Sequence, residues 1–319
     1  MPKEERKFVD DGWAIWVDGE DVSTVYINDW LNPKGNSYVD LGVRIRGVQI
    51  STALHVYVPF AIQKEEIEDV SLFFNDKKIL QATFNSACII DYMKNEHASE
   101  IAYNGKTVDV IHISTLDYKV SPLADGTLID VDLESLKPFL DNDEAYFIWR
   151  MPHKSLDQIF HKRMNVGNVL TRLRDLITTP IVEEKYNYSI RINEARRLPY
   201  EITKIGAFHR QKLNKAIITI SVNDDYGLND AGCHRIRRLE ENLYKDYLPA
   251  KYKSSDVITY QWNQDREFNQ EGHFQFYYNI NKSSVSRGSM FLYVVLLLGL
   301  SVAGELLADL VKLLTGWKF

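Results

Sequence analysis

The segment Leu128-Ile-Asp-Val-Asp-Leu133 shows the pattern that decides the fold class. Its apolar residues alternate with Asp130 and Asp132, so every second side chain is apolar. Successive side chains of a β-strand point to opposite faces, which makes this alternation typical of a half-buried strand. The segment therefore predicts a strand that buries Ile129 and Val131 and leaves both carboxylates in water.

Similar short segments recur through the first 150 residues. They are rich in β-branched and aromatic residues, which favour strands, and include Val43–Arg46, Leu54–Val58, Val108–Ile113 and Ala145–Trp149. Turn-forming pairs separate them, among them Asn32–Gly35, Asn75–Asp76, Asn104–Gly105, Asp125–Gly126 and Asp141–Asp143. Short strands with regular turns are typical of an all-β domain. The sequence thus predicts an antiparallel β-sandwich-like domain over 1–150.

The apolar period changes after residue 150. A helical connector is expected over 151–180, where Ser155 with Gln158 forms a capping box and Pro180 ends the helical pattern. A mixed α+β domain is expected over 181–282, in a fold that is mainly β or α+β as a whole. Its one clear helix face is formed by Ile236, Leu239, Leu243, Tyr247 and Leu248.

The segment from Met290 to Gly304 reads MFLYVVLLLGLSVAG and carries no charge. A bilayer core of about 30 Å needs roughly 20 helical residues, and extension to Leu310 supplies them by including Glu305 and Asp309. A charge costs about 2.5–3.5 kcal/mol at the bilayer centre but less near the ends. The sequence predicts a single transmembrane helix over 290–314. A buried core helix and an amphipathic surface helix are the alternatives.

The polar and small residues of this helix fall on one stripe at 100° per residue. Small residues let helices approach closely in lipid, and ionisable residues in such segments usually face protein or water. The stripe therefore predicts self-association into a homo-oligomer. The alternative is that its charges only mark where the helix leaves the bilayer. Its members are Ser301, Gly304, Glu305, Ala308, Asp309 and Lys312.

The rest of the chain is expected in the cytosol. The start, MPKEERKFVDDGW, has no apolar core of the kind found in secretory signals. Two cysteines do not define a disulfide framework and suit a reducing compartment. The expected topology is single-pass and tail-anchored, with most of the chain on the cytosolic side of the lipid bilayer.

Charge is divided unevenly along the chain. Residues 1–150 carry 14 Lys and Arg against 26 Asp and Glu, whereas residues 151–250 carry 17 against 12. The basic part predicts contact with lipid headgroups or with an anionic ligand such as a nucleotide. Nucleic acid is compatible but not specifically indicated, and the alternatives are the acidic half of the chain or plain solvation. The candidate residues are Arg191, Arg196, Arg197, Arg235, Arg237 and Arg238.

Motifs with catalytic spacing are missing from the sequence: it contains no phosphate-binding loop, zinc-binding helix or nucleophile elbow. We therefore expect no cofactor, and name no catalytic or metal-ligating residue. The favoured function is a membrane-tethered recognition or sensing module for a protein or anionic partner. One alternative is a membrane-perturbing effector, as in bacterial antiviral defence, whose assembled tail helices breach the bilayer. Another is a membrane-bound enzyme whose site is assembled from distant residues.

Overall fold

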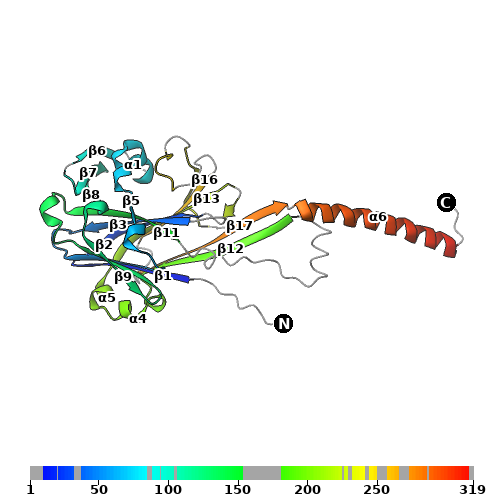
Figure 1. Ribbon diagram of the computed structural model, residues 1–319, viewed down its shortest axis with the longest axis horizontal. Coiled ribbons are helices and arrows are strands. Elements are labelled where there is room, and N and C mark those ends of the chain that lie inside the picture. Colours follow the sequence, from blue (N-terminus) through cyan, green and yellow to red (C-terminus); the bar gives the residue numbers. More distant parts are fainter. Residues whose placement is uncertain are drawn as a thin grey trace. The chain divides into compact units, whose positions relative to one another are not determined.

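A computed structural model of the chain is mostly β, with two mixed sheets and one apolar helix near the C-terminus (Figure 1). The structure describes residues 10–19, 21–31, 37–84, 88–93, 95–103, 106–153, 181–224, 226–228, 232–240, 244–249, 257–265, 273–285 and 287–315. The connector predicted over 151–180 lies outside the described residues except for 151–153, which end a strand.

The larger sheet has the strand order β15-β16-β13-β2-β3-β11-β8-β7-β6, with β5 paired to β11. Its strands are β2 (Val22–Trp30), β3 (Ser37–Arg46), β5 (Glu68–Asp69), β6 (Cys88–Met93), β7 (Ala98–Tyr103), β8 (Lys106–Ile111), β11 (Glu144–His153), β13 (Leu213–Asn223), β15 (Arg235–Arg238) and β16 (Val257–Asp265).

The second sheet has the order β14-β17-β12-β1-β4-β10-β9. Its strands are β1 (Asp10–Asp18), β4 (Ala53–Val58), β9 (Tyr118–Leu123), β10 (Gly126–Asp132), β12 (Ile181–Ile192), β14 (Gly227–Leu228) and β17 (Phe274–Val285). The predicted strand at 128–133 coincides with most of β10, in which Ile129 and Val131 are buried.

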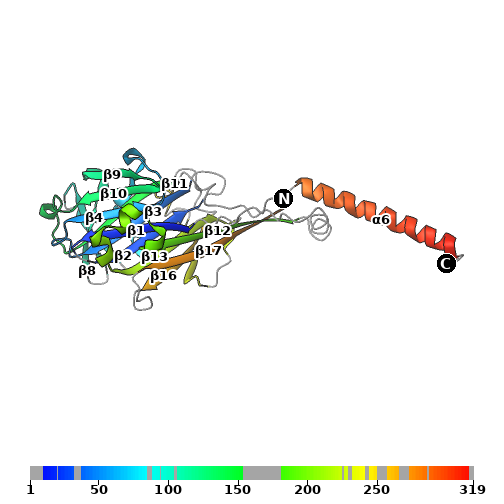
Figure 2. The same ribbon diagram turned by 90° about the horizontal axis from the view of Figure 1, so that it is seen from below.

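Both sheets combine antiparallel with parallel pairs. Strand β1 lies parallel to β12 and β2 lies parallel to β13, while β8 pairs in parallel with β11 (Figure 2). Strands from 1–150 and from 181 onward thus share both sheets. The alternation of apolar and polar residues identifies a strand but does not show which other strand pairs with it. Parallel pairing between strands so far apart in the chain could therefore not be predicted from the sequence.

The chain divides into two compact units, each described here by itself. Unit 1 combines Met1–Phe160, Asn187–Asp224 and Asp230–Tyr278. Unit 2 comprises His161–Tyr186, Asp225–Asn229 and Asn279–Phe319.

The core of unit 1 includes one aromatic cluster that underlies the site described below. Trp30, Phe74, Tyr146 and Tyr247 are among its largest buried members. Tyr247 makes ring contacts with the first two of them at 6.1 and 6.5 Å between centroids. Such pairs add about 0.5–1.5 kcal/mol beyond simple burial, so this part of unit 1 is firmly packed.

The helix predicted from Ile236 onward is wrong at its start. Residues 235–238 form the edge strand β15, which pairs antiparallel with β16. Ile236 is 62% exposed, so it does not belong to an apolar helix face. Leu239, Tyr247 and Leu248 are buried, as predicted, but they pack from the segment that follows the strand. The helical spacing arose because apolar residues of a strand and a later turn happened to match a period of 3.6.

Helices are few within the described residues. They are α1 (Lys77–Phe84), α4 (Tyr200–Thr203), α5 (Gly206–Arg210) and α6 (Arg287–Thr315), with 3-10 turns at Lys64–Glu66, Ser71–Asn75, Ile113–Thr115, Lys137–Phe139 and Ala195–Arg197. The sequence prediction of an apolar helix at 290–314 is confirmed by α6. Its window Tyr293–Leu314 is long and apolar enough to cross a membrane, and none of it is buried.

Candidate functional site

The six candidate arginines fall into two groups. Four of them, Arg191, Arg196, Arg197 and Arg238, are not among the residues that line the pocket formed by the other two. Arg191 Nη1 donates to Glu194 Oε2 at 2.7 Å, and Arg196 Nε donates to Glu194 Oε1 at 2.9 Å. Burial alone would raise the pKa of Glu194, but the hydrogen bonds from these arginines outweigh it and lower the pKa. Arg238 Nη2 lies 2.7 Å from Asp224 Oδ2, and Arg197 is exposed.

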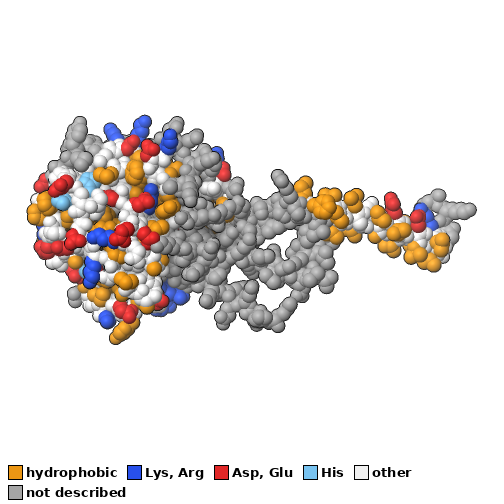
Figure 3. All heavy atoms as spheres, viewed as in Figure 1, with side chains coloured by type: hydrophobic (Ala, Val, Ile, Leu, Met, Phe, Trp, Pro, Cys, Tyr) orange, Lys and Arg blue, Asp and Glu red, His pale blue; other side chains and the backbone are white. Residues whose placement is uncertain are grey.

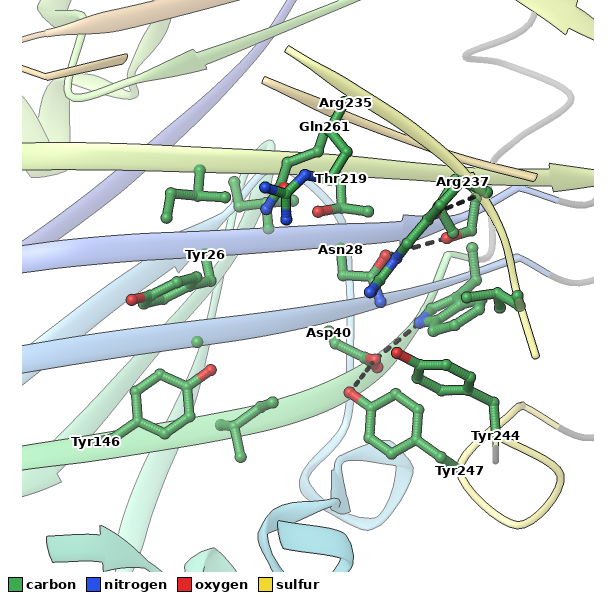
Figure 4. Close-up of a pocket in the computed structure, with 18 residues that line it drawn as sticks. Tyr26, Asn28, Asp40, Tyr146, Thr219, Arg235, Arg237, Tyr244, Tyr247 and Gln261 are labelled. Atoms are coloured by element: carbon green, nitrogen blue, oxygen red, sulfur yellow. Dashed lines mark hydrogen bonds between the residues drawn. The ribbon is translucent and has the colours of Figure 1, made fainter. Parts of the chain in front are cut away.

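Arg235 and Arg237 instead line a pocket on one face of the larger sheet (Figure 4). The two residues are two positions apart on β15, so their side chains leave the same face of the strand. The pocket lies entirely within unit 1. Its volume is about 70 Å³, whereas pockets for drug-sized ligands measure about 300–1,000 Å³. The space therefore suits one polar group of a ligand.

Strand register explains why polar side chains gather there. Arg235 pairs with Gln261, Gln261 with Thr219, Thr219 with Asn28, and Asn28 with Asp40. Directly opposed residues on neighbouring strands place their side chains on the same face, about 4.5–5.5 Å apart at Cβ. These five residues therefore form one polar row across five strands, which we call the polar row.

The opposite face of the same strands is apolar. Ile218 and Ile220 of β13 and Ile27 of β2 are buried, whereas Thr219 and Asn28 between them are only half-buried. This alternation fixes which face of the sheet carries the pocket. A slip of one residue in register would move the polar row into the core.

The floor of the pocket is held by a buried ion pair between Asp40 and Arg150. Arg150 Nε donates to Asp40 Oδ1 at 2.6 Å and Nη2 donates to Oδ2 at 2.9 Å. Asp40 Oδ2 also accepts from Trp30 Nε1 at 2.7 Å and from the Tyr247 hydroxyl at 2.8 Å. Asp40 is the one acidic side chain among the described lining residues, and Arg150 neutralises it. The described lining thus contains two arginines of β15 and one carboxylate that Arg150 already neutralises.

Two tyrosines form the pocket walls. Burial raises the pKa of Tyr26, and it also raises the pKa of Tyr244 against the opposing effect of Arg237. The Arg237 guanidinium carbon lies 5.8 Å from the centre of the Tyr244 ring. The Tyr244 hydroxyl is buried and has no hydrogen-bond partner of normal geometry among the described residues. Both hydroxyls remain protonated at neutral pH and can donate to an anion.

The stripe predicted on α6 is exposed along its whole length. Ser301, Glu305, Ala308 and the other members have no covering residue within the described chain, and a Cβ added at Gly304 would meet no atom. Lys312 Nζ lies 3.1 Å from Asp309 Oδ1, one turn away on the same helix. Figure 3 shows hydrophobic side chains over most of α6, with the charged atoms toward its C-terminal end.

Two histidines, His112 and His55, lie within hydrogen-bonding distance of side chains that often take part in catalysis. His112 Nδ1 and Nε2 each lie 2.9 Å from a serine Oγ, those of Ser71 and Ser99. A serine beside a histidine is the arrangement of nucleophilic catalysis, but all three residues are buried and no substrate can reach them. His55 lies between two carboxylates, with Nδ1 2.6 Å from Asp130 Oδ1. His55 is partly exposed, and its hydrogen-bond partners among the described residues are both carboxylates, with no nucleophilic side chain.

Metal-binding groupings are likewise missing from the described residues, where no cluster of three or more potential ligands occurs. Cys233 and His234, the neighbouring pair in the sequence, precede β15, and Cys233 Sγ lies 3.0 Å from the Arg235 carbonyl oxygen. No known family model and no curated protein sequence matches this chain.

Arg235 and Arg237 were predicted from the sequence as site residues, but the other residues that line the pocket were not. Most of the lining residues come from six strands, and the register of these strands brings them together. One signal was available: Thr219 and Ser221 alternate with isoleucines in a segment that is otherwise apolar. A strand buried on both faces would not carry hydroxyls at alternate positions, so this alternation indicated a polar face.

Proposed function

We propose that this chain is a membrane-tethered recognition module. In this proposal α6 spans the bilayer and the β-rich part, its two sheets packed as a sandwich, binds an anionic or protein partner from the cytosol. The observation that carries the proposal is the 22-residue apolar window Tyr293–Leu314, none of which is buried.

Length and energetics both favour a span. At 1.5 Å per residue, 22 helical residues extend about 33 Å, which matches a hydrocarbon core of about 30 Å. In water, such a contiguous apolar surface would be far larger than a soluble monomer normally exposes. Leu298, Leu306 and Leu313 are each more than 60% exposed. Transfer into lipid removes this unfavourable surface.

Alkaline carbonate extraction tests the anchor. The full chain is compared with a version that ends at Gly288 and with the full-length variant Val302→Arg/Leu306→Arg. We expect the full chain to stay in the membrane pellet. The shortened and charged versions should be released, because each charge near the centre of the helix costs about 2.5–3.5 kcal/mol on insertion. Release of the full chain itself would refute the anchor.

Self-association through the stripe is the second part of the proposal. Glu305, Asp309 and Lys312 are the exposed ionisable side chains of a helix that is otherwise apolar. In lipid such groups are stabilised when they face another helix. The variant Glu305→Leu/Asp309→Leu should lose oligomers seen by cross-linking in membranes. The matched variant Leu306→Ala/Leu310→Ala, on the opposite side of the helix, should keep them.

The same stripe supports one alternative, a membrane-perturbing effector. Assembled helices could line a water-filled path with Glu305, Asp309 and Lys312, and the β-rich part would act as the sensor. Expression with a membrane-potential dye separates the two functions. Loss of potential that depends on the stripe would favour the effector, whereas stable potential with stripe-dependent oligomers would favour recognition alone.

A further inference from the structure

We propose that the pocket beside β15 binds the phosphate group of a small phosphorylated molecule, with Arg235 and Arg237 as its cationic ligands. This inference deepens the recognition part of the proposed function and rests on it. The shared chemistry is a phosphate monoester. It can come from a soluble nucleotide or from a phosphorylated lipid headgroup.

Charge is the first argument. The pocket holds two guanidinium groups from β15, and its one described carboxylate, Asp40, already accepts two hydrogen bonds from Arg150. The guanidinium groups therefore outnumber the carboxylates among the described lining residues. Guanidinium groups bind phosphate oxygens through parallel N–H donors, and the two arginines project from the same face of one strand. Arg235 makes no ion pair with any described residue.

Neutral donors supply the second argument. Asn28, Thr219 and Gln261 of the polar row are half-buried and open to the pocket. Figure 4 shows Thr219 and Asn28 between the two arginines and the tyrosines below. Amide and hydroxyl groups can donate to the remaining oxygens of a phosphate.

The Tyr244 hydroxyl is a third and independent observation. It lines the pocket, and its side chain is 5% exposed. Arg237 contacts the hydroxyl oxygen, but the hydroxyl hydrogen has no acceptor of normal geometry among the described residues. A buried donor without an acceptor is costly, and natural proteins rarely keep one without a reason. A ligand oxygen in the pocket would supply the missing acceptor.

Volume limits what enters. About 70 Å³ holds a phosphate-sized group but not a whole nucleotide or lipid headgroup. The remainder of the ligand would therefore lie outside the pocket, toward the exposed side chain of Arg235. Most of the binding selectivity would then reside in the phosphate, with weaker preference for the group that carries it.

Binding is tested by isothermal calorimetry on the full chain in detergent micelles at constant salt. The probes are inorganic phosphate, ATP and glycerophosphoinositol 4-phosphate, the deacylated form of a lipid headgroup. We expect saturable binding of at least one organic probe, displaced by inorganic phosphate. Stronger binding of ATP indicates a soluble ligand, and stronger binding of the inositol probe indicates a lipid. No saturable binding of any probe would overturn the proposal.

Variants connect binding to the pocket. Arg235→Gln changes an exposed side chain and should weaken binding about tenfold, the effect of one lost charge-assisted hydrogen bond. Arg238→Gln is the matched control, because this neighbour on β15 lies outside the pocket lining and pairs with Asp224. It should bind like the wild type. Equal weakening by both variants would show bulk charge attraction and refute the site.

Tyr244→Phe covers the case in which an arginine variant alters the fold. It removes only the hydroxyl, whose hydrogen has no acceptor among the described residues and whose oxygen is contacted by Arg237, so the melting temperature without ligand should change little. Binding of the organic probe should weaken, and the stabilisation that the probe gives should shrink. Unchanged binding in Tyr244→Phe would show that the hydroxyl does not contact the ligand. Unchanged binding in both Tyr244→Phe and Arg235→Gln would overturn the proposal. Carbonate extraction is independent of these variants, so failure of the pocket and failure of the membrane anchor are distinguishable.

Discussion

Replacement of Arg150 by methionine should destabilise unit 1 strongly. The side chains of Arg150 and Asp40 are 3% and 2% exposed, and two hydrogen bonds join them. Methionine has similar length but leaves the Asp40 carboxylate buried without its counter-charge. Breaking a buried ion pair in this way costs about 3–5 kcal/mol.

The remaining contacts place the loss within that range. Asp40 Oδ2 would still accept hydrogen bonds from Trp30 Nε1 and the Tyr247 hydroxyl. The Tyr247 carbonyl oxygen, however, would lose the donor that Arg150 Nη1 supplies at 2.7 Å. Two retained donors reduce the penalty on the carboxylate, so we expect a loss near the lower end, about 3 kcal/mol. Against a total stability of about 5–15 kcal/mol this is a large fraction.

Urea unfolding followed by tryptophan fluorescence measures the change. Arg46→Met is the matched control, because the Arg46 side chain is 53% exposed and pairs with Glu144 at 3.0 Å. Exposed pairs contribute about 0–1 kcal/mol. The double variant Asp40→Asn/Arg150→Met should be more stable than Arg150→Met alone, because it buries no charge. If Arg150→Met costs no more than the control, the buried pair does not support the pocket floor as argued.

Three smaller changes should also be measurable. Burial alone would lower the pKa of His55, but its hydrogen bonds to two carboxylates raise it. Its stabilising contribution is therefore present below about pH 6.5 and is lost as the pH rises through its higher folded pKa. Urea titrations should show this loss in the wild type but not in His55→Gln. Burial lowers the pKa of His112, so the free energy of unfolding should fall as the pH drops below about 6.5. In His112→Phe this dependence of the free energy of unfolding on pH should be weaker. Its total stability should fall by about 1–3 kcal/mol, because two buried hydroxyls lose a partner. A Cβ at Gly126 would collide with the carbonyl oxygen of Val58, which is backbone and cannot move aside freely. Gly126→Ala should therefore cost about 1–3 kcal/mol of stability, measured by thermal unfolding. An unchanged melting temperature would contradict this.

The elements that could be predicted from the sequence were those with a strong local period. The alternation at 128–133 predicted a strand that coincides with most of β10, and the uncharged segment from Met290 predicted α6. Both depend only on residues close together in the chain. The short edge strand β15 did not carry such a signal, because three of its four residues are arginine and Ile236 is exposed.

The pocket could not be predicted, because its geometry depends on pairing between strands. Asn28 and Thr219 are separated by most of the chain, yet register places them opposite one another. Arg191 and Arg235 looked equivalent in the sequence, but the first pairs with Glu194 and the second faces the pocket. The two arginines differ because the fold places a carboxylate beside Arg191, and this placement could not be read from the pattern of a single sequence.

The parallel pairing of β1 with β12 also constrains how the chain can be made. Asp10 lies opposite Ser189, so β1 leaves the ribosome about 180 residues before its partner. At about 5–20 residues per second this delay lasts roughly 10–40 s, and β2 waits similarly for β13. During that time both strands present unpaired edges, which readily join other chains. The last strand, β17, ends at Val285, only two residues before α6 begins. The last strand and the apolar helix therefore leave the ribosome almost together. Within this short interval the nascent chain exposes both unpaired strand edges and an apolar helix, and both need protection from aggregation.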